Sequence, residues 1–470
     1  MLRSCFLLMK PLFSPASVSR RYLVPNAGLP SFQHRTPHAL SPSPFRSITS
    51  SVDTSSVLYE PIEGVERMEY YRSGGYHPVT IGDRFRDRYW VVHKLGHGTY
   101  STVWLARDEK CHRYVAVKVC TADANPLEAN ILSRLSNPQK LSDTGRTMIP
   151  SIWDRFTIQG PNGSHHCLVT SPARVSLSDA KNASWISLSQ LDVARALAAQ
   201  LVIAVRYIHS QGLVHGDLHR GNILLQPPGG FDELTTEELY KLYGEPVLEP
   251  VNRLDGQDLP PGVPQHGVLP VWLGEASENI TLSEARIILS DFGEAFSPAQ
   301  EEKFESHTPL LIRPPEARFE PTKPLTFSSD IWTLACTIFD ILAQRPLFEG
   351  FLTNEDDMTC QQIDALGPLP AEWEEAWAAH RNKLAEDGQP VKRAQYLPWD
   401  DLFERRVRRP RIEEGMSPLE PSERDALFAM LRSMLSFRPE HRPSAQQVLE
   451  SEWTVKWALP EYERIGKTQQ

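Results

Sequence analysis

The segment HGDLHRGNIL at 215–224 places an aspartate and an asparagine in one loop, after a helical stretch and before an apolar one. Asp217 can orient an acceptor hydroxyl and take its proton, and Asn222 can bind a metal ion from the same loop. Asp291, in an Asp-Phe-Gly triplet, can supply a second oxygen ligand to magnesium, and the glycine lets the chain turn away. These side chains suit phosphoryl transfer, which depends on positioning and charge neutralisation.

A lysine and a glycine-rich segment upstream could hold a triphosphate. The glycines of GHGTYSTV lie between two expected strands, where backbone amides can approach phosphate oxygens without a Cβ in the way. Lys118, in VAVK, is within reach of the α- and β-phosphates, and Glu128 in LEANILSRL is the carboxylate expected to hold it, although Glu109 and Asp123 are also near. The expected ATP-binding residues are Leu95, Gly96, His97, Gly98, Thr99, Tyr100, Ser101, Thr102, Val103 and Lys118.

The elements that must position these residues follow from hydrophobic periodicity and turn signals. Strands are expected around the glycine segment, at 114–119 and at 287–289, and helices at 125–135, 188–209, 330–342 and 423–435. The pattern predicts an α+β protein of two lobes, the first a small antiparallel sheet with one helix and the second larger and mainly helical.

A segment rich in chain breakers separates the catalytic loop from Asp-Phe-Gly. It contains PPGG and LPPGVP, and one short helix is expected from a capping box at Thr235 and Glu238 to a stop at Gly244. We interpret residues 226–285 as an insertion in the second lobe.

Composition limits the possible functions. The chain has 470 residues, 40% of them hydrophobic, and no apolar run approaches the roughly 20 residues of a membrane span. Six dispersed cysteines without CxxC pairs suggest neither a zinc site nor disulfides. The net charge is −10 although residues 1–52 carry only basic charges, so the remainder is acidic. This field disfavours direct nucleic-acid binding and favours basic partners, but a merely solubilising surface is the preferred explanation of the acidic charge.

The chain divides into four predicted parts. Residues 1–58 form a tail rich in Ser, Pro and Arg without acids over most of its length, which fits either a mitochondrial transit peptide or a disordered segment. Residues 59–88 form an N-terminal extension, 89–457 the catalytic domain with lobes at about 89–173 and 174–457, and 458–470 a C-terminal tail.

Taken together, the motifs GHGTYSTVWL, VAVK, HGD with its later Asn, DFG, PPE and DIW resemble the eukaryotic protein kinase family over about residues 85–457. Within that family, LGHGTYSTVWLA with Ser101 in place of the third glycine, GPNGSH before the hinge and DALGPLP at 364–370 resemble the CMGC-type SR-protein kinases. The resemblance implies a two-lobed kinase fold, ATP and Mg²⁺ as cofactors, and protein serine or threonine hydroxyls as acceptors, with Arg-Ser-rich proteins as one possibility. A monomer is expected.

The resemblance also implies supporting residues. Glu316 stands in Pro-Pro-Glu where kinases have Ala-Pro-Glu, and Arg442 is its expected buried partner. Asp330 would anchor the backbone of the catalytic loop. Thr308 lies where serine/threonine kinases carry a threonine that contacts the catalytic aspartate, but its spacing to Glu316 is one residue long.

Two departures from the family pattern affect regulation and turnover. Gly216 replaces the arginine that usually binds a phosphorylated activation loop, which suggests a loop ordered without phosphorylation. His219 replaces a lysine that contacts the γ-phosphate, and either His219 or Arg220 could substitute for it. The same loop also resembles those of aminoglycoside-type small-molecule kinases, and a pseudokinase scaffold is a further alternative.

Substrate and location stay open at this level. Acidic residues that could attract Arg-rich substrates, or simply form a solvated helix face, are Glu355, Asp356, Asp357, Asp364, Glu372, Glu374 and Glu375. The resemblance implies cytoplasm and nucleus, whereas the N-terminal segment suggests mitochondria.

Overall fold

The computed structural model describes residues 58–136, 143–350, 353–386 and 398–467. The predicted transit peptide or disordered tail lies outside them, apart from residue 58. No helix in these ranges is both long and apolar enough to cross a bilayer.

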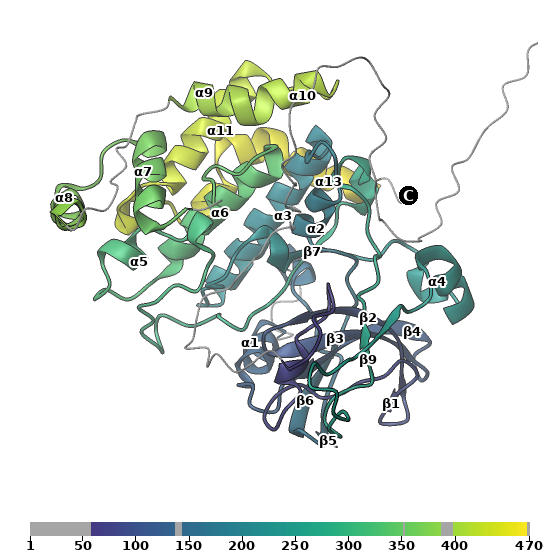
Figure 1. The fold of residues 1–470 in the computed structure, drawn as a ribbon. Coiled ribbons are helices and arrows are strands. Elements are labelled where there is room, and N and C mark those ends of the chain that lie inside the picture. Colours follow the sequence, from purple (N-terminus) through teal and green to yellow (C-terminus); the bar gives the residue numbers. More distant parts are fainter. Residues whose placement is uncertain (1–57, 137–142, 351–352, 387–397, 468–470) are drawn as a thin grey trace, which may run out of the picture. The chain divides into compact units, whose positions relative to one another are not determined.

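The small lobe is a six-stranded antiparallel sheet in the order β1-β2-β3-β4-β6-β5, with one helix, α1, which confirms the predicted architecture (Figure 1). Val91, Trp104, Val117 and Val169 come from four neighbouring strands and are buried in one cluster on one face of the sheet. The bounds are β1 Arg84–Phe85, β2 Tyr89–Gly98, β3 Ser101–Asp108, β4 Arg113–Cys120, β5 Asp154–Gly160, β6 Gly163–Thr170 and α1 Leu127–Leu135.

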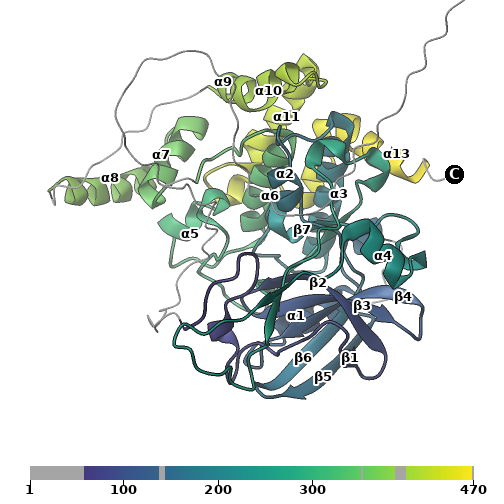
Figure 2. The same cartoon turned by 45° about the vertical axis from the view of Figure 1, so that its right-hand side comes forward.

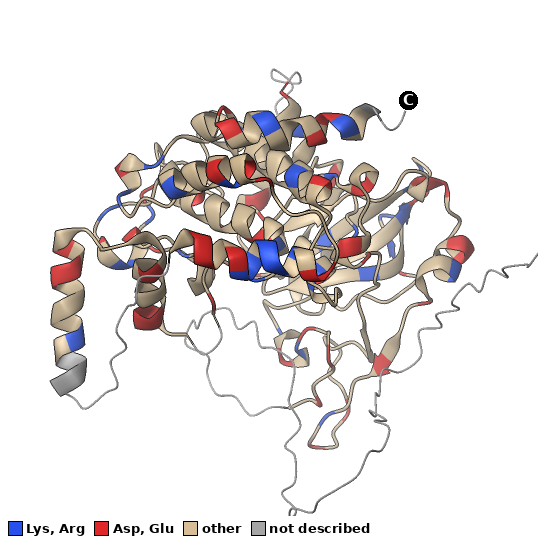
Figure 3. Ribbon diagram, turned by 90° about the horizontal axis from the view of Figure 1, so that it is seen from above, with Lys and Arg blue, Asp and Glu red and all other residues tan. Residues whose placement is uncertain are grey.

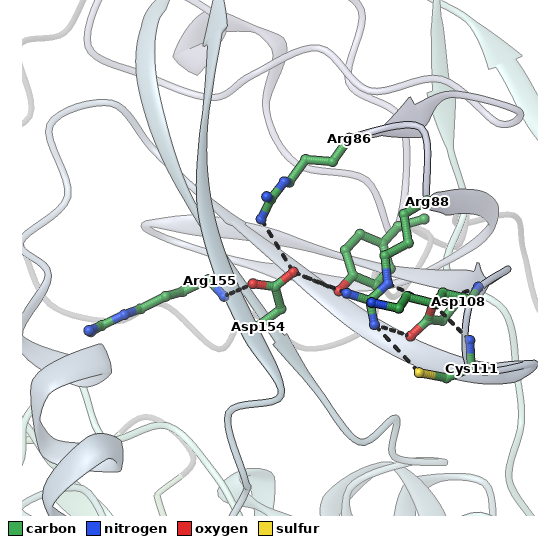
Figure 4. A network of polar contacts seen from close by, with 8 residues as sticks. Arg86, Arg88, Asp108, Cys111, Asp154 and Arg155 are labelled. Atoms are coloured by element: carbon green, nitrogen blue, oxygen red, sulfur yellow. Dashed lines mark hydrogen bonds and ion pairs between the residues drawn. The ribbon is translucent and has the colours of Figure 1, made fainter.

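Polar contacts hold the turn between β1 and β2, the first two strands of this sheet (Figure 4). Arg88 donates two hydrogen bonds of 2.8 Å to the buried carboxylate of Asp108 at the end of β3. Asp154 at the start of β5 accepts a 2.8 Å hydrogen bond from the Tyr89 hydroxyl. A bidentate arginine–carboxylate pair has one geometry, so these contacts hold the first turn of the sheet against β3 and β5.

The large lobe is built around two helices that are buried on most of their faces, α3 and α6. Helix α3 packs against α6, α12 and α13, and its run of alanines permits close approach. Both were predicted as helices, and their observed starts differ by three residues from the predicted ones. The helix bounds are α2 Leu177–Asn182, α3 Leu191–Ser210, α5 Glu316–Phe319, α6 Phe327–Leu342, α7 Glu355–Leu366, α8 Ala371–Glu386, α9 Trp399–Phe403, α10 Arg409–Glu413, α11 Pro421–Met434, α12 Ala445–Leu449 and α13 Leu459–Lys467.

The end of the chain differs from the predicted C-terminal tail. Helix α13 packs against α3, where Ile465 is buried and Glu461 lies 3.5 Å from Arg195. The reason is its amphipathic pattern, which places Tyr462 and Ile465 on one face.

The insertion leaves the large lobe after β7 Ile223–Leu225 and returns to it at β10 Ile287–Leu289, the antiparallel partner strand of β7. It forms the predicted helix, α4 Thr236–Tyr243, with the capping box of Thr235 and Glu238 and the stop at Gly244. It then forms the hairpin of β8 Leu248–Pro250 and β9 His266–Val268 beside the small-lobe sheet (Figures 1 and 2). The insertion therefore starts and ends in one lobe and packs against the other.

The N-terminal extension also covers the small lobe, and two histidines meet where it does so. The rings of His77 in the extension and His165 in β6 lie 4.9 Å apart. Among the described residues, neither His77 Nδ1 nor His165 Nε2 has a hydrogen-bond partner. Burial, together with the charge of its neighbour, lowers the pKa of His77 to about 4, and burial lowers the pKa of His165. Both imidazoles are therefore neutral in the folded protein at pH 7.

This pair predicts acid sensitivity. Between pH 6.5 and 4 the unfolded chain binds protons that the folded chain excludes, so the free energy of unfolding falls as pH falls through this window. The His77→Gln variant should lose less stability than the wild type between pH 7 and 5 in urea titrations. His166→Gln, on the exposed face of the same strand as His165, is the matched control. An unchanged pH slope in His77→Gln would contradict the assignment.

Candidate active site

The catalytic loop is held by one buried carboxylate. Asp330, at the start of α6, accepts hydrogen bonds from the backbone amides of His215 at 2.7 Å and Gly216 at 3.0 Å, and from His209 Nε2 at 2.9 Å. Burial raises the pKa of Asp330, but the hydrogen bond and charge of His209 outweigh it, so the pKa lies below its usual range. The anchor anticipated from the sequence has this geometry.

Asp217 follows these amides directly and faces the site with one oxygen unpaired. The amide of Asn222 donates to the Asp217 backbone oxygen at 2.9 Å and to Oδ2 at 3.1 Å. Among the described residues, Oδ1 of Asp217 is buried and has no hydrogen-bond partner. Because the nitrogen of the Asn222 amide is used in this way, its oxygen is left for a cation.

The pairing of strands β7 and β10 brings Asp291 close to Asn222. Asn222 immediately precedes β7, and its carbonyl accepts hydrogen bonds from the amide and hydroxyl of Ser290, the residue before Asp291. Asp291 has a left-handed backbone with φ 61°, which a non-glycine residue rarely adopts. Phe292 is buried against the ring of His215, 4.9 Å away, so the triplet is packed onto the catalytic loop.

Lys118 and Glu128 form the predicted contact between β4 and α1. The Lys118 ammonium donates to Glu128 Oε2 at 2.6 Å. Burial lowers the pKa of Lys118, but the charges of Glu128 and Asp291 outweigh it and raise the pKa. The alternative acids are engaged elsewhere: Glu109 with Arg84 and Asp123 with Thr121.

The glycine segment is a strand hairpin with a two-residue turn rather than a longer loop. Gly96 and Gly98 lie in β2, and a Cβ added to either would meet no atom within 4 Å, so the space beside them is open. Thr102 was predicted to bind ATP with the rest of the segment. Its side chain is buried, however, and its hydroxyl accepts a hydrogen bond from the indole N–H of Trp104. Its side chain faces the sheet and not the open space.

Glu316 and Arg442 form the buried pair expected from their spacing and family resemblance. Two parallel hydrogen bonds of 2.7 Å join the guanidinium to the carboxylate. Arg442 also donates to the carbonyl oxygens of Ser328, Ser436 and Phe437, so its remaining N–H groups are satisfied.

The segment after Asp-Phe-Gly is held by residues that the sequence did not single out. Glu294 accepts from Lys303 at 2.5 Å and lies 2.9 Å from His307 Nδ1. Gly216 approaches the same segment so closely that an added Cβ would lie 2.6 Å from the Glu294 carbonyl oxygen, at φ 78°. No motif marks Lys303 or His307, because their role depends on the path of the loop.

Thr308 is not placed on Asp217, the predicted proton acceptor. Its hydroxyl lies 2.5 Å from that of Ser306, and its carbonyl accepts from Arg313. No hydrogen bond joins it to Asp217 within the described ranges, which agrees with its long spacing to Glu316.

The two substitutes for the missing lysine point in different directions. His219 Nε2 lies 3.5 Å from Asp217 Oδ2, while its Nδ1 accepts the Gly221 amide. Arg220 instead forms an ion pair with Asp340, a buried residue that also binds Lys181. Of the two, it is therefore His219 that lies beside Asp217.

The acidic helices are partly neutralised within the protein. Positions of acidic residues recur along α7 and α8, at the left in Figure 3. Asp356 accepts hydrogen bonds from Arg318 at 2.5 Å and from the Trp377 indole at 3.1 Å, and Glu372 pairs with Arg438. Glu374 and Glu375 are exposed, so the acidic surface that solvent meets is smaller than the sequence suggested.

Comparison with known proteins agrees with this geometry. Residues 89–232 and 277–454 match the protein kinase domain family, and the gap falls within the insertion. A serine/threonine protein kinase of Aspergillus fumigatus is 29% identical over 88% of this chain and 96% of its own length. The serine/threonine-protein kinase SRPK of Physarum polycephalum is 27% identical over 82% of this chain and 90% of its own, and human SRSF protein kinase 3 is 35% identical over 33% and 28%.

A solved kinase domain shares the fold, with a TM-score of 0.56 and 19% identity over 81% of this chain and 98% of that one. These likenesses support the protein kinase prediction and neither the small-molecule kinase nor the pseudokinase. The chain belongs to the protein kinase family, as a serine/threonine kinase related to the SR-protein kinases.

Proposed function

We propose that this serine/threonine kinase transfers the γ-phosphate of Mg-ATP with Asp217 as the proton acceptor. The observation that supports this most is the buried, unpartnered Oδ1 of Asp217, beside an asparagine that is bonded to it. A buried acceptor without a donor is costly unless a ligand supplies one, and a substrate hydroxyl would do so.

Asn222 and Asp291 would hold the metal, and the glycine hairpin the phosphates. An amide oxygen and a carboxylate fit Mg²⁺, which takes few protein ligands and completes its shell with water and phosphate oxygens. When bound, Mg²⁺ neutralises charge on the phosphate oxygens. Lys118, oriented by Glu128, would bind the α- and β-phosphates, and the open space beside Gly96 and Gly98 leaves room for the triphosphate.

Asp217→Asn tests the proton acceptor. We predict that kcat falls by about 10² to 10⁴ while ATP binding stays near wild type, because the amide cannot accept the proton but keeps the loop packing. Phosphate transfer to a basic protein and ATP binding by calorimetry measure the two effects. Asp258→Asn, exposed in the insertion, is the control. A variant that kept a tenth or more of kcat would exclude Asp217 as the base.

We further propose that the activation segment needs no phosphorylation. Glu294 and its cations, Lys303 and His307, supply an ion pair inside the segment, in a place where Gly216 leaves no arginine to bind a phosphate. Partial burial raises the pKa of Glu294, but the hydrogen bonds from Lys303 and His307 outweigh it and lower the pKa, so the carboxylate is charged at neutral pH.

Enzyme treated with phosphatase should therefore keep most of its activity. Lys303→Met should reduce kcat by roughly tenfold by removing a charge-assisted hydrogen bond, and Lys303→Arg should retain it. Intact mass spectrometry would verify that no phosphate remains. Loss of nearly all activity on dephosphorylation would contradict the proposal.

For the substrate, we propose Arg-Ser-rich proteins, bound by a monomer whose kinase domain spans 89–457 with the insertion 226–285. Support comes from the SR-protein kinase relatives and from exposed acids on α7 and α8. Charge attraction of this kind adds specificity and weakens with salt.

Glu374→Lys, exposed on α8, tests this docking surface without removing the α7 cap, in which Asp357 takes part. The KM for an Arg-Ser peptide should rise about three- to tenfold at low salt, and the difference should shrink at high salt. The KM for ATP should stay unchanged. Glu413→Lys, exposed on α10, is the control. An unchanged peptide KM would contradict docking at this surface.

A further inference from the structure

The N-terminal extension and the insertion share a hydrophobic core outside the two lobes. We call these residues, Leu58–Asp83 together with the packed part of the insertion at 247–271, the brace. Its buried members come from segments nearly two hundred positions apart in the chain, so neither segment can form this core alone. They are Tyr59, Val65, Met68, Tyr71, Tyr76, Val251 and Val263. The brace thus has a hydrophobic cluster of its own and lies against the small lobe (Figures 1 and 2).

A buried ion pair fastens the brace to the strand that enters the glycine hairpin. Lys94 in β2 pairs with Glu66 of the brace, and the side chains are 0% and 3% exposed. The Tyr71 hydroxyl donates to the other oxygen of Glu66 at 2.5 Å. Because an unpaired buried charge is strongly destabilising, Lys94 and Glu66 stay paired in the folded protein.

Tyr76 links the brace to the tip of the glycine hairpin. Its hydroxyl donates to the Gly98 carbonyl oxygen at 2.6 Å, and the Thr99 carbonyl oxygen lies at 3.1 Å. Both residues belong to the hairpin tip that is proposed to bind phosphate. The hydroxyl has one proton, so the shorter contact to Gly98 is the principal one.

The backbone of Tyr76 is in turn held by Asn162. Asn162, in the turn between β5 and β6, donates from one amide to the carbonyl oxygens of Tyr76 and Gly262, both at 2.7 Å. Asn162 thus joins the extension to the insertion. The path from Asn162 through Tyr76 to Gly98 consists of one buried and one partly buried hydrogen bond.

We propose that Tyr76 is a positioning residue for ATP, which holds the glycine hairpin in the conformation that binds phosphate. The inference rests on the proposed function, in which this hairpin contacts the triphosphate. Glycine-containing tips sample many backbone conformations, and ordering them on binding weakens affinity. A tip already tied to the brace avoids part of that cost.

Tyr76→Phe removes the hydroxyl and keeps the ring. The dissociation constant for Mg-ATP and the KM for ATP should rise about two- to tenfold, the value of one hydrogen bond, while the peptide KM stays within twofold. Hydrogen exchange of the amides at 98–103 should become faster in the nucleotide-free enzyme.

Tyr71→Phe is the matched control, because it removes a buried tyrosine hydroxyl from the same brace without touching the hairpin. It should lower the melting temperature and leave ATP affinity within twofold. Equal losses of ATP affinity in both variants would reduce Tyr76 to a structural role, and an unchanged ATP affinity in Tyr76→Phe would overturn the proposal.

Lys118→Met separates this inference from the proposed function. If Lys118→Met binds ATP like the wild type, the proposed nucleotide site is wrong, whereas hydrogen exchange in Tyr76→Phe still reports on the tether. If Lys118→Met loses ATP binding and Tyr76→Phe does not, only the role of Tyr76 fails.

Discussion

The catalytic geometry depends on the buried carboxylate of Asp330. A carboxylate in the interior is unfavourable unless donors surround it, and here two consecutive backbone amides and one imidazole do so. Two neighbouring amides can point at one carboxylate only if the backbone bends sharply, and Gly216 takes φ 78° at that bend. Asp217 is the next residue, so its orientation follows from the anchor. The loop is positioned by α6, whose own place is set by packing against α3.

The insertion changes how the two lobes are connected. In the chain, the insertion separates the catalytic loop from Asp-Phe-Gly. The pairing of β7 with β10 nevertheless keeps Asn222 and Asp291 near each other, so the length of the insertion does not disturb the site. The intervening residues pack on the small lobe, where α4 covers Leu105 and Tyr114 and the brace encloses Glu66 with Lys94. A segment that begins and ends in one lobe and packs on the other constrains their relative movement.

At Gly216 and His219, where the sequence departs from the usual kinase pattern, neighbouring residues make contacts that explain the departure. Gly216 leaves room for the Glu294 carbonyl, and Lys303 and His307 supply the charges that hold Glu294. Arg220 instead pairs with Asp340, a buried acid that also contacts Lys181. An ion pair within the segment after Asp-Phe-Gly thus stands where the family pattern has a phosphate-binding arginine. Of the two residues that could replace the missing lysine, His219 is the one beside Asp217.

The sequence by itself determined the class of protein and most of the secondary structure. Fixed spacings such as Asp217 to Asn222 lie within one loop, the capping box of α4 is local, and the apolar period of α3 reflects burial, so none of them requires knowledge of distant contacts. Only the tertiary structure decided which residues meet across long separations. The partnerships of Tyr76 with Gly98, Lys94 with Glu66 and Glu294 with Lys303, the inward face of Thr102 and the packed α13 depend on chain paths that no local pattern encodes. Physically, periodicity reports whether a side chain is buried, whereas its partner is set by which other segment packs there.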